Sequence, residues 1–137
     1  LIRALEKHVG LLVHNAPPIE LETNNYHPHS LEYEVTLFRI AQEALNNVVK
    51  YAQATEVKIL LYEEEDFVCL SVIDDGVGFD VAQVQNGRSG SKKGGFGLHT
   101  MQERAQAHNG YVTIRSESGQ GTAVTVCLPQ ENGGHAE

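Results

Sequence analysis

The order and patterning of segments along this chain predict an α+β fold, a two-layer α/β sandwich with helices packed on one face of a mixed or antiparallel sheet. Three segments carry apolar residues at helical spacing, and two pairs of segments alternate between apolar and polar residues as the strands of β-hairpins do. A doubly wound parallel sheet is disfavoured, because its strands are usually uniformly apolar. The chain has 137 residues, 41% of them hydrophobic, which is enough for one domain with a core.

Composition and charge limit the classes of function. The net charge of −8 argues against a nucleic-acid-binding protein, which would present a basic surface. No apolar run is long enough to span a bilayer, and no signal peptide is visible. The first residue is Leu1 and not Met, so we expect a fragment of a longer protein. Cys69 and Cys127, the only cysteines, lie in strand-like apolar runs and are predicted to be small, reduced core residues.

The N-terminal segments predict a helix, a strand and a polar loop. Residues 1–14 carry apolar side chains at helical spacing, and a Pro-Pro pair ends the helix. A short strand is predicted for residues 19–22 and a loop for residues 24–30. His27 and His29 of this loop have no acidic or cysteine partner nearby in the sequence, so exposed side chains are favoured over a metal site.

A second helix is predicted for residues 31–51, with Ser30 as its N-cap and Glu34 in its first turn. Its apolar face consists of Leu37, Ala41, Ala44, Leu45, Val48 and Ala52. Its polar stripe consists of Arg39, Glu43, Asn46, Asn47 and Lys50. The stripe is either a solvated surface or a site. Two adjacent asparagines favour a site, because Ala, Glu or Lys would stabilise a helix better. A carboxylate and an amide one turn apart suit a hard cation, which prefers oxygen ligands.

The next two alternating segments, residues 56–62 and 67–73, predict a β-hairpin. Because side chains alternate along a strand, Asp74 continues the apolar face of the second strand. If that face is the core side, the carboxylate points into the protein and requires a bound hydrogen-bond donor or a water. Alternatively the strand ends one residue earlier, and Asp74 and Asp75 are turn residues.

Two glycine-rich motifs flank a polar loop and together suggest a nucleotide site. The first motif, residues 74–79, ends a strand with an acid and a glycine turn, and the second, residues 94–101, opens a helix. Glycines let the backbone approach a ligand, and a helix N-terminus suits phosphate. The loop between the motifs carries three of the 10 basic residues of the chain. Residues 85–95 are therefore either a mobile lid over an anion or a loop kept soluble by its lysines.

The C-terminal part of the chain predicts a helix and a second hairpin. The helix covers residues 97–109, and the alternating strands cover residues 111–116 and 122–128. A proline ends the last strand, and the residues after it are polar. We expect one domain over residues 1–129 and a disordered tail over residues 130–137.

Four motifs together resemble the ATP-binding domain of two-component sensor histidine kinases, a domain of the GHKL ATPase superfamily. Residues 42–50 resemble the asparagine box of this family, and residues 74–79 resemble its DxGxG box. Residues 95–105 resemble its second glycine box, and residues 121–122 its closing GT pair. Each motif is weak alone, but the four have the order and spacing of the family and cover nearly the whole chain. The second glycine box is most similar to the subfamily that includes nitrate sensors and membrane or cell-wall stress sensors.

The resemblance implies roles for the residues that match the first two boxes. Asp74 would accept a hydrogen bond from the adenine amino group of ATP. Gly76 and Gly78 would let the backbone approach the base. Asn47 would coordinate Mg²⁺ through its side-chain oxygen, and Glu43, one turn back, would polarise the reacting group or a water.

The resemblance also implies contacts with the phosphates and the closure of the pocket. Lys50 would reach a phosphate. Gly95, Gly97 and Leu98 would belong to the lid hinge and the phosphate cradle, and Thr122 would close the pocket from the sheet. The implied cofactors are therefore ATP and Mg²⁺.

The implied activity is transfer of the γ-phosphate of ATP to a histidine on a separate dimerisation domain, which this sequence does not show, for relay to a response regulator. The implied location is cytoplasmic, without direct membrane contact. Tyr51 departs from the subfamily, which often has histidine there, and this puts a phosphate contact from that position in doubt. His8 is predicted to be an ordinary residue on a helix surface. The alternative function is an ATP-binding module without histidine-kinase output, such as a degenerate sensor kinase or a serine-phosphorylating anti-sigma regulator.

Overall fold

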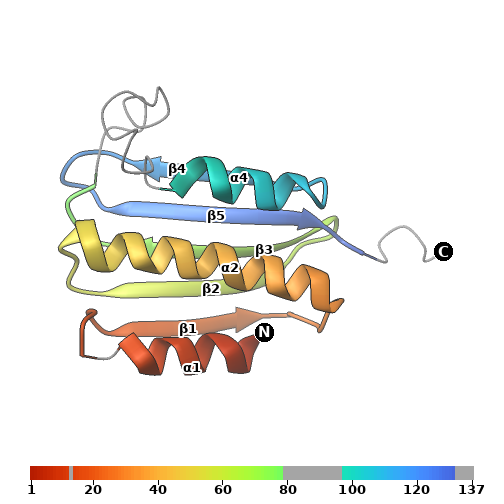
Figure 1. The fold of residues 1–137 in the computed structure, drawn as a ribbon, viewed down its shortest axis with the longest axis horizontal. Coiled ribbons are helices and arrows are strands. Elements are labelled where there is room, and N and C mark those ends of the chain that lie inside the picture. The colour runs from red at the N-terminus through yellow and green to blue at the C-terminus, as the bar shows by residue number, and fades with distance from the viewer. Residues whose placement is uncertain (13, 79–96, 132–137) are drawn as a thin grey trace.

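Three α-helices cover one face of a five-stranded sheet in the computed structural model, which describes residues 1–12, 14–78 and 97–131 (Figure 1). The helices are α1 (Ile2–Leu12), α2 (Leu31–Asn47) and α4 (Leu98–Gln106), and a π-helical turn, η1 (Val48–Ala52), follows α2. The strands are β1 (Ile19–Asn24), β2 (Val57–Glu63), β3 (Phe67–Asp74), β4 (Tyr111–Ser116) and β5 (Thr122–Pro129). The predicted fold class, a two-layer α+β sandwich, is confirmed.

The sheet is mixed, with the strand order β1-β2-β3-β5-β4. Only β1 and β2 pair in parallel, and α2 forms the crossover that a parallel pair requires. Both predicted hairpins are present, as the antiparallel pairs β2–β3 and β4–β5. The second hairpin joins the first through β5, which pairs with β3. The ends of β3, β5 and β4 therefore lie side by side, although residue 74 and residue 116 are far apart in the sequence.

The core lies between the helices and the sheet. The apolar face predicted for the second helix is confirmed, because all of its residues are buried: Leu37, Ala41, Ala44, Leu45, Val48 and Ala52. Large side chains from the sheet, such as Ile59 and Leu70, complete this core. Fully burying a side chain of this size stabilises the fold by about 1.5–3 kcal/mol. The core therefore holds α2 in a fixed position over the strands.

The helix ends differ from the predicted ones. Ser30 caps α2 as predicted, because its Oγ accepts a hydrogen bond of 3.2 Å from the Tyr33 N–H. The predicted single helix to residue 51 is an α-helix that ends at Asn47 and continues as η1. The helix predicted to end at residue 109 ends at Gln106, and a turn with Asn109 at a φ of +64° follows it. No helix in the described ranges is long and apolar enough to cross a bilayer.

Cys69 and Cys127 form a disulfide between β3 and β5, which corrects the prediction of reduced cysteines. The two residues face each other directly in the antiparallel register, with their Cα atoms 4.2 Å apart. Directly opposed residues of an antiparallel pair have Cα atoms about 4.5–5.5 Å apart, so a bridge between such residues needs little movement of the strands. Their burial was predicted correctly, but a separation of 58 residues in the sequence concealed their pairing.

A polar group called here the hairpin-end cluster joins the loop before α2 to the β2–β3 hairpin and the end of β5. Its members are His27, His29, Glu63, Gln130 and Glu131. The Nε2 atom of His29 lies 3.0 Å from Glu63 Oε2, and its Nδ1 atom lies 3.2 Å from Glu131 Oε1. The side chain of His27 is 78% exposed, as predicted, whereas that of His29 is only 7% exposed. The prediction for His29 was wrong because its acidic partners are distant in the sequence.

Two residues of the predicted tail take part in this cluster. Gln130 Nε2 donates to Glu63 Oε1 over 3.1 Å, and Glu131 Oε1 accepts a hydrogen bond of 2.8 Å from the Ser30 N–H. Although burial alone would raise the pKa of the Glu63 carboxyl, hydrogen bonds from the His27 N–H, Gln130 and His29 hold it below its usual range. Gln130 and Glu131 therefore contact the folded domain. The remainder of the predicted tail lies outside the described residues, and the domain boundary stays a prediction.

His8 is not the ordinary surface residue that the sequence predicts. It is half-buried, and its ring packs edge-to-face on Phe38 with the ring centroids 5.8 Å apart. Its Nε2 atom is buried without a hydrogen-bond partner in the part of the chain that the structure describes. The side chain acts here as an aromatic contact between α1 and α2.

Candidate functional site

Asp74 ends β3 on the side of the sheet that the helices cover, and only 7% of its surface is exposed. Its Oδ1 accepts a hydrogen bond of 2.7 Å from the Gly76 N–H, and the Thr122 N–H also donates to this carboxyl. Burial nevertheless raises the pKa of Asp74 above its usual range, and the neighbouring Asp75 charge acts in the same direction. Both sequence interpretations are therefore partly correct: the carboxylate faces inward, and it also caps the following turn.

The neighbouring Asp75 has the opposite environment. It is exposed, and its carboxyl accepts hydrogen bonds from the Thr55 hydroxyl, from the Thr55 N–H at 2.7 Å and from the Glu56 N–H at 3.0 Å. These bonds, that of the hydroxyl first, hold the pKa of Asp75 below its usual range. Asp75 thus holds the segment that leads into β2, and Asp74 is the acid of this pair that faces the interior.

The two glycines of the first motif lie against other backbone segments. A Cβ on Gly76 would come within 2.1 Å of the Ala52 carbonyl oxygen, and a Cβ on Gly78 would come within 2.1 Å of the Glu117 carbonyl oxygen. Gly78 also has a φ of +68°, which other residues rarely adopt. Between them, the Val77 N–H donates to the Ala52 carbonyl over 2.7 Å. This loop is therefore fixed between η1 and the β4–β5 turn, and an approach of these glycines to a base stays a prediction.

Glu43 and Asn47 lie near the C-terminal end of α2, and the side chain of Glu43 lies against the start of α4. Asn47 is the last residue of α2 and only 5% exposed, and the π-helical turn that follows it is a feature frequently found at functional sites. The Glu43 carboxylate lies so close to Gly97, the N-cap of α4, that a Cβ there would be 2.2 Å from Glu43 Oε2. Gly97 has a φ of +72°, which also favours glycine. The carboxylate therefore lies at the positive end of the α4 dipole.

The predicted polar stripe on α2 divides into two environments. Arg39, Asn46 and Lys50 are exposed, as a solvated surface would be. Glu43 is half-buried and Asn47 is buried. The two adjacent asparagines differ because successive residues of a helix point in directions about 100° apart. Glu43 and Asn47 are therefore the stripe residues that face the start of α4 and the interior.

The remaining predicted site residues occupy different positions. Thr122 begins β5 and is buried directly opposite Asp74 in the register of the sheet. Leu98 begins α4 and is half-buried, whereas Lys50 is exposed on η1. Gly95 and the predicted lid over residues 85–95 lie outside the described residues.

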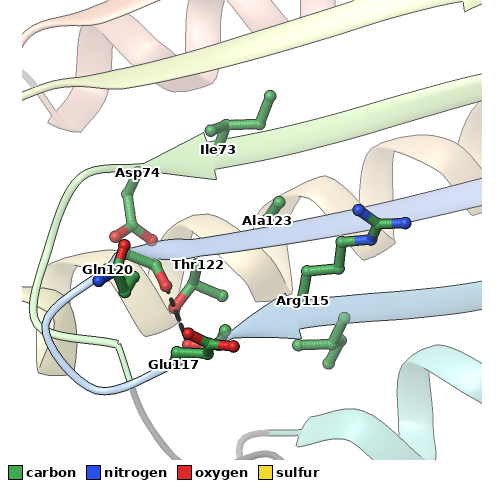
Figure 2. Close-up of a pocket in the computed structure, with 10 residues that line it drawn as sticks. Ile73, Asp74, Arg115, Glu117, Gln120, Thr122 and Ala123 are labelled. Atoms are coloured by element: carbon green, nitrogen blue, oxygen red, sulfur yellow. Dashed lines mark hydrogen bonds between the residues drawn. The ribbon is translucent and has the colours of Figure 1, made fainter.

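A hollow of about 540 Å³ opens at the ends of β3, β5 and β4 (Figure 2). Its lining residues are Ile73, Asp74, Ile114, Arg115, Ser116, Glu117, Gln120, Gly121, Thr122 and Ala123. Figure 2 shows the polar ends of Asp74, Thr122, Gln120 and Glu117 gathered at these strand ends. Ser116 was not identified as a site residue from the sequence, although the alternation of its strand indicates the position. It continues the face of its strand that contains the buried Val112, as Asp74 continues the core face of β3.

The described residues contain no group of three His, Cys, Asp or Glu side chains that could hold a metal ion. Glu43 places a carboxylate oxygen beside Gly97 at the start of α4, and the Asn47 amide lies one turn further along α2. Mg²⁺ prefers such oxygen ligands and usually completes its shell with water and phosphate oxygens. The residues present therefore fit a metal ion that arrives together with a phosphate ligand.

Comparison with known proteins gives one family and several relatives. The model of the family described as "Histidine kinase-, DNA gyrase B-, and HSP90-like ATPase" matches residues 32–132. The histidine-protein kinase/phosphatase DegS of Bacillus subtilis is 37% identical over 98 residues, which are 72% of this chain and 24% of DegS. The histidine-protein kinase/phosphatase UhpB of Salmonella typhimurium is 42% identical over 96 residues, 70% of this chain and 17% of UhpB.

A third relative and a solved structure agree with this result. The oxygen sensor histidine kinase NreB of Staphylococcus carnosus is 41% identical over 99 residues, 72% of this chain and 26% of NreB. The chain thus spans only 17% to 26% of the length of these three relatives. The histidine kinase domain of a blue-light activated kinase from Erythrobacter litoralis has a TM-score of 0.68 and covers 94% of this chain and 60% of its own, with 16% identity. At this identity the likeness concerns the fold.

Proposed function

Because this chain belongs to the family of histidine kinase-, DNA gyrase B- and HSP90-like ATPases, we propose that it is the ATP-binding catalytic domain of a sensor histidine kinase. The whole protein would transfer the γ-phosphate of ATP to a histidine on its own dimerisation domain. A response regulator would then receive the phosphoryl group. DegS, UhpB and NreB, which share this domain, are described as histidine kinases. The proposal places this part of the protein in the cytoplasm, where ATP and the response regulator are found.

The observation that carries the proposal is the contact between Glu43 and Gly97. These residues belong to two different motifs, 54 positions apart in the sequence, and the Glu43 carboxylate lies against Gly97, the N-cap of α4. Phosphoryl transfer depends on positioning and charge stabilisation more than on a protein nucleophile. A carboxylate next to a helix N-terminus places an oxygen ligand beside a surface that suits anions.

The base end of the ligand would lie at Asp74. The buried carboxylate would accept a hydrogen bond from the adenine amino group, and Thr122, its cross-strand partner, would form the wall beside it. The raised pKa of Asp74 supports this assignment, because perturbed acids in hollows are often functional.

The phosphate end of the ligand would extend toward α2 and α4. The Asn47 amide oxygen would bind Mg²⁺, and the exposed Lys50 would contact a phosphate. When bound, Mg²⁺ supplies neutralisation of the charge that develops on the transferred phosphoryl group. Glu43 would orient the reacting group, and Gly97 leaves the space in which its carboxylate lies.

Titration of the chain with ATP, with and without Mg²⁺, tests the nucleotide site. We expect saturable binding that Mg²⁺ strengthens. We also expect that labelled ATP alone leaves the chain unlabelled, because the acceptor histidine belongs to another domain. Addition of the dimerisation domain of the same full-length protein should then give acid-labile label on that domain.

Three results would contradict the proposal. Absence of ATP binding would remove the nucleotide site altogether. Stable, acid-labile label on one of the seven histidines of this chain would show that no separate acceptor is needed. ATP binding with transfer to a serine of a partner, and none to a histidine, would identify the serine-kinase alternative.

A further inference from the structure

Three polar side chains form a row across neighbouring strands at the edge of the hollow. Asp74 of β3 pairs with Thr122 of β5, and Thr122 pairs with Ser116 of β4 in the register of the sheet. All three line the hollow, where Figure 2 shows Asp74 and Thr122 side by side at the strand ends. Asp74 and Thr122 are each 7% exposed. Ser116 closes the row on the side away from Asp74.

The hydrogen bonds of Ser116 determine which way the Thr122 hydroxyl points. Ser116 Oγ lies 3.0 Å from the Gly121 carbonyl oxygen and 2.9 Å from Thr122 Oγ1. A carbonyl oxygen can only accept, and a serine hydroxyl has one proton to give. Both contacts can be hydrogen bonds at once only when Ser116 donates to Gly121 and Thr122 donates its own proton to Ser116. The oxygen of Thr122 is then left as an acceptor.

The Gly121 carbonyl that receives this proton is held in place by the backbone. Gly121 has a φ of +82°, and a Cβ on it would come within 2.3 Å of the Asp74 carbonyl oxygen. Such a position excludes any other residue without movement of the strand ends. The direction of the Ser116 hydroxyl is thus fixed by the chain path and not by the ligand.

We infer that Ser116 is a positioning residue that makes this edge of the site acceptor-only and thereby selects adenine over guanine nucleotides. The inference rests on the proposed function and adds a specificity determinant to it. With Ser116 present, both the Asp74 carboxylate and the Thr122 oxygen can only accept from a ligand. The amino group of adenine donates, whereas guanine carries a carbonyl oxygen at the corresponding ring position. An acceptor facing acceptors leaves buried groups unpaired, which weakens binding.

Removing the Ser116 hydroxyl frees the Thr122 proton. In Ser116→Ala the Thr122 hydroxyl can rotate and donate to a guanine carbonyl, so GTP binding improves while ATP binding weakens. We expect the ratio of the dissociation constants for GTP and ATP to fall roughly tenfold, about the worth of one hydrogen bond. Ser116→Thr keeps the hydroxyl and should restore the parental ratio.

The chain offers a matched control on the other face of the sheet. Ser71 and Thr125 form a hydroxyl pair at 2.8 Å between β3 and β5, and neither residue lines the hollow. Ser71→Ala removes the same group from the same kind of pair, so it should cost similar stability and leave the nucleotide ratio unchanged. Thermal melting of each variant measures the structural part of the effect.

The measurement is a competition titration of ATP and GTP against the parent chain and the three variants. A parent that prefers ATP, with a reduced preference in Ser116→Ala alone, supports the inference. An unchanged ratio in Ser116→Ala, or an equal change in Ser71→Ala, would overturn it while the proposed function stands. A parent that binds neither nucleotide would overturn the proposed function and, with it, this inference.

Discussion

Two polar groups lie at opposite ends of the sheet, and they differ in how their acids are satisfied. In the hairpin-end cluster, Glu63 and Glu131 each accept hydrogen bonds from several donors, and the pKa of both is held below its usual range. At the other end, burial raises the pKa of Asp74, in spite of two backbone N–H donors. A saturated polar cluster stabilises a fold, whereas a buried charge without full compensation is a cost that a ligand can relieve.

This difference distinguishes the polar residues that stabilise the fold from those that bind a ligand. In the sequence, both ends contain acidic residues in or near loops. The direction of the pKa shift separates them, because internal donors lower the pKa of an acid and desolvation raises it. We therefore expect substitutions at the hairpin end to alter stability and substitutions at the hollow to alter nucleotide binding.

The largest expected effect is on binding, at Asp74. Asp74→Ala removes the acceptor for the ligand amino group and should weaken ATP binding roughly ten- to hundredfold, equivalent to about 1–3 kcal/mol. The melting temperature should change little, because loss of the bonds from Gly76 and Thr122 is offset by removal of a buried charge. Asp75→Ala is the matched control and should lower stability without lowering ATP affinity. If instead Asp74→Ala lowered stability alone and Asp75→Ala lowered ATP affinity, Asp75 and not Asp74 would be the acid that binds the nucleotide.

The second effect is on stability, at the hairpin end. Glu63→Ala leaves the His27 N–H, the His29 ring and Gln130 without their shared acceptor. We expect a loss of about 1–3 kcal/mol in the free energy of unfolding, measured by urea denaturation, and unchanged ATP affinity. Glu64→Ala, at the next and exposed position, should leave both quantities unchanged. A marked loss of ATP affinity in Glu63→Ala would connect the two ends and remove the distinction.

A smaller effect is expected at Asn47, which tests the metal part of the site. Asn47→Ala should reduce, by severalfold, the gain in ATP affinity that Mg²⁺ provides, because an amide oxygen is lost as a ligand. Binding without metal should change less. Asn46→Ala, its exposed neighbour, should behave as the parent. If Mg²⁺ strengthens ATP binding equally in both variants, Asn47 is a structural residue of the helix end.

The smallest effect is the pH dependence of Glu63 and Asp74, which should have opposite signs. The stability that Glu63 adds is present above its ordinary pKa of 4.5 and is lost as the pH falls through its lowered folded value. The contribution of Asp74 is present below its ordinary pKa of 3.8 and is lost as the pH rises through its raised folded value. The cost of Glu63→Gln should therefore shrink in acid, whereas that of Asp74→Asn should shrink toward neutral pH.

Urea denaturation at a series of pH values measures both slopes. The parent chain supplies the reference at each pH, so that only the substituted carboxyl differs. Equal slopes for the two variants would show that folding shifts the pKa of both acids in the same direction.

Local patterning was sufficient to predict much of the fold. Apolar alternation predicted both hairpins, helical spacing predicted the buried face of α2, and Ser30 was recognised as its cap. Alternation also offered the inward position of Asp74, as one of two alternatives, and the structure shows this residue buried. These features depend on neighbours close in the sequence, so the sequence displays them directly.

Features that depend on the register of distant strands could not be predicted in this way. The Cys69–Cys127 disulfide and the row from Asp74 to Ser116 require that β5 pairs with β3 on one side and β4 on the other. The partners of His29 come from the β2–β3 hairpin and from the segment that follows β5. Hydrophobic periodicity gives the face of each side chain but not the strand that lies beside it.

The close contact of the first glycine motif with two other segments has a consequence for folding. Gly76 packs on Ala52 at the end of η1, and Gly78 packs on Glu117 in the last hairpin. Segments so distant in the sequence meet only after the large loops between them have closed, which is a slow and late event in folding. A chain whose last hairpin has not yet docked would lack the wall of the hollow. Nucleotide affinity should therefore appear only with the last folding step, and a fluorescent ATP analogue would report completion of the native sheet in a refolding experiment.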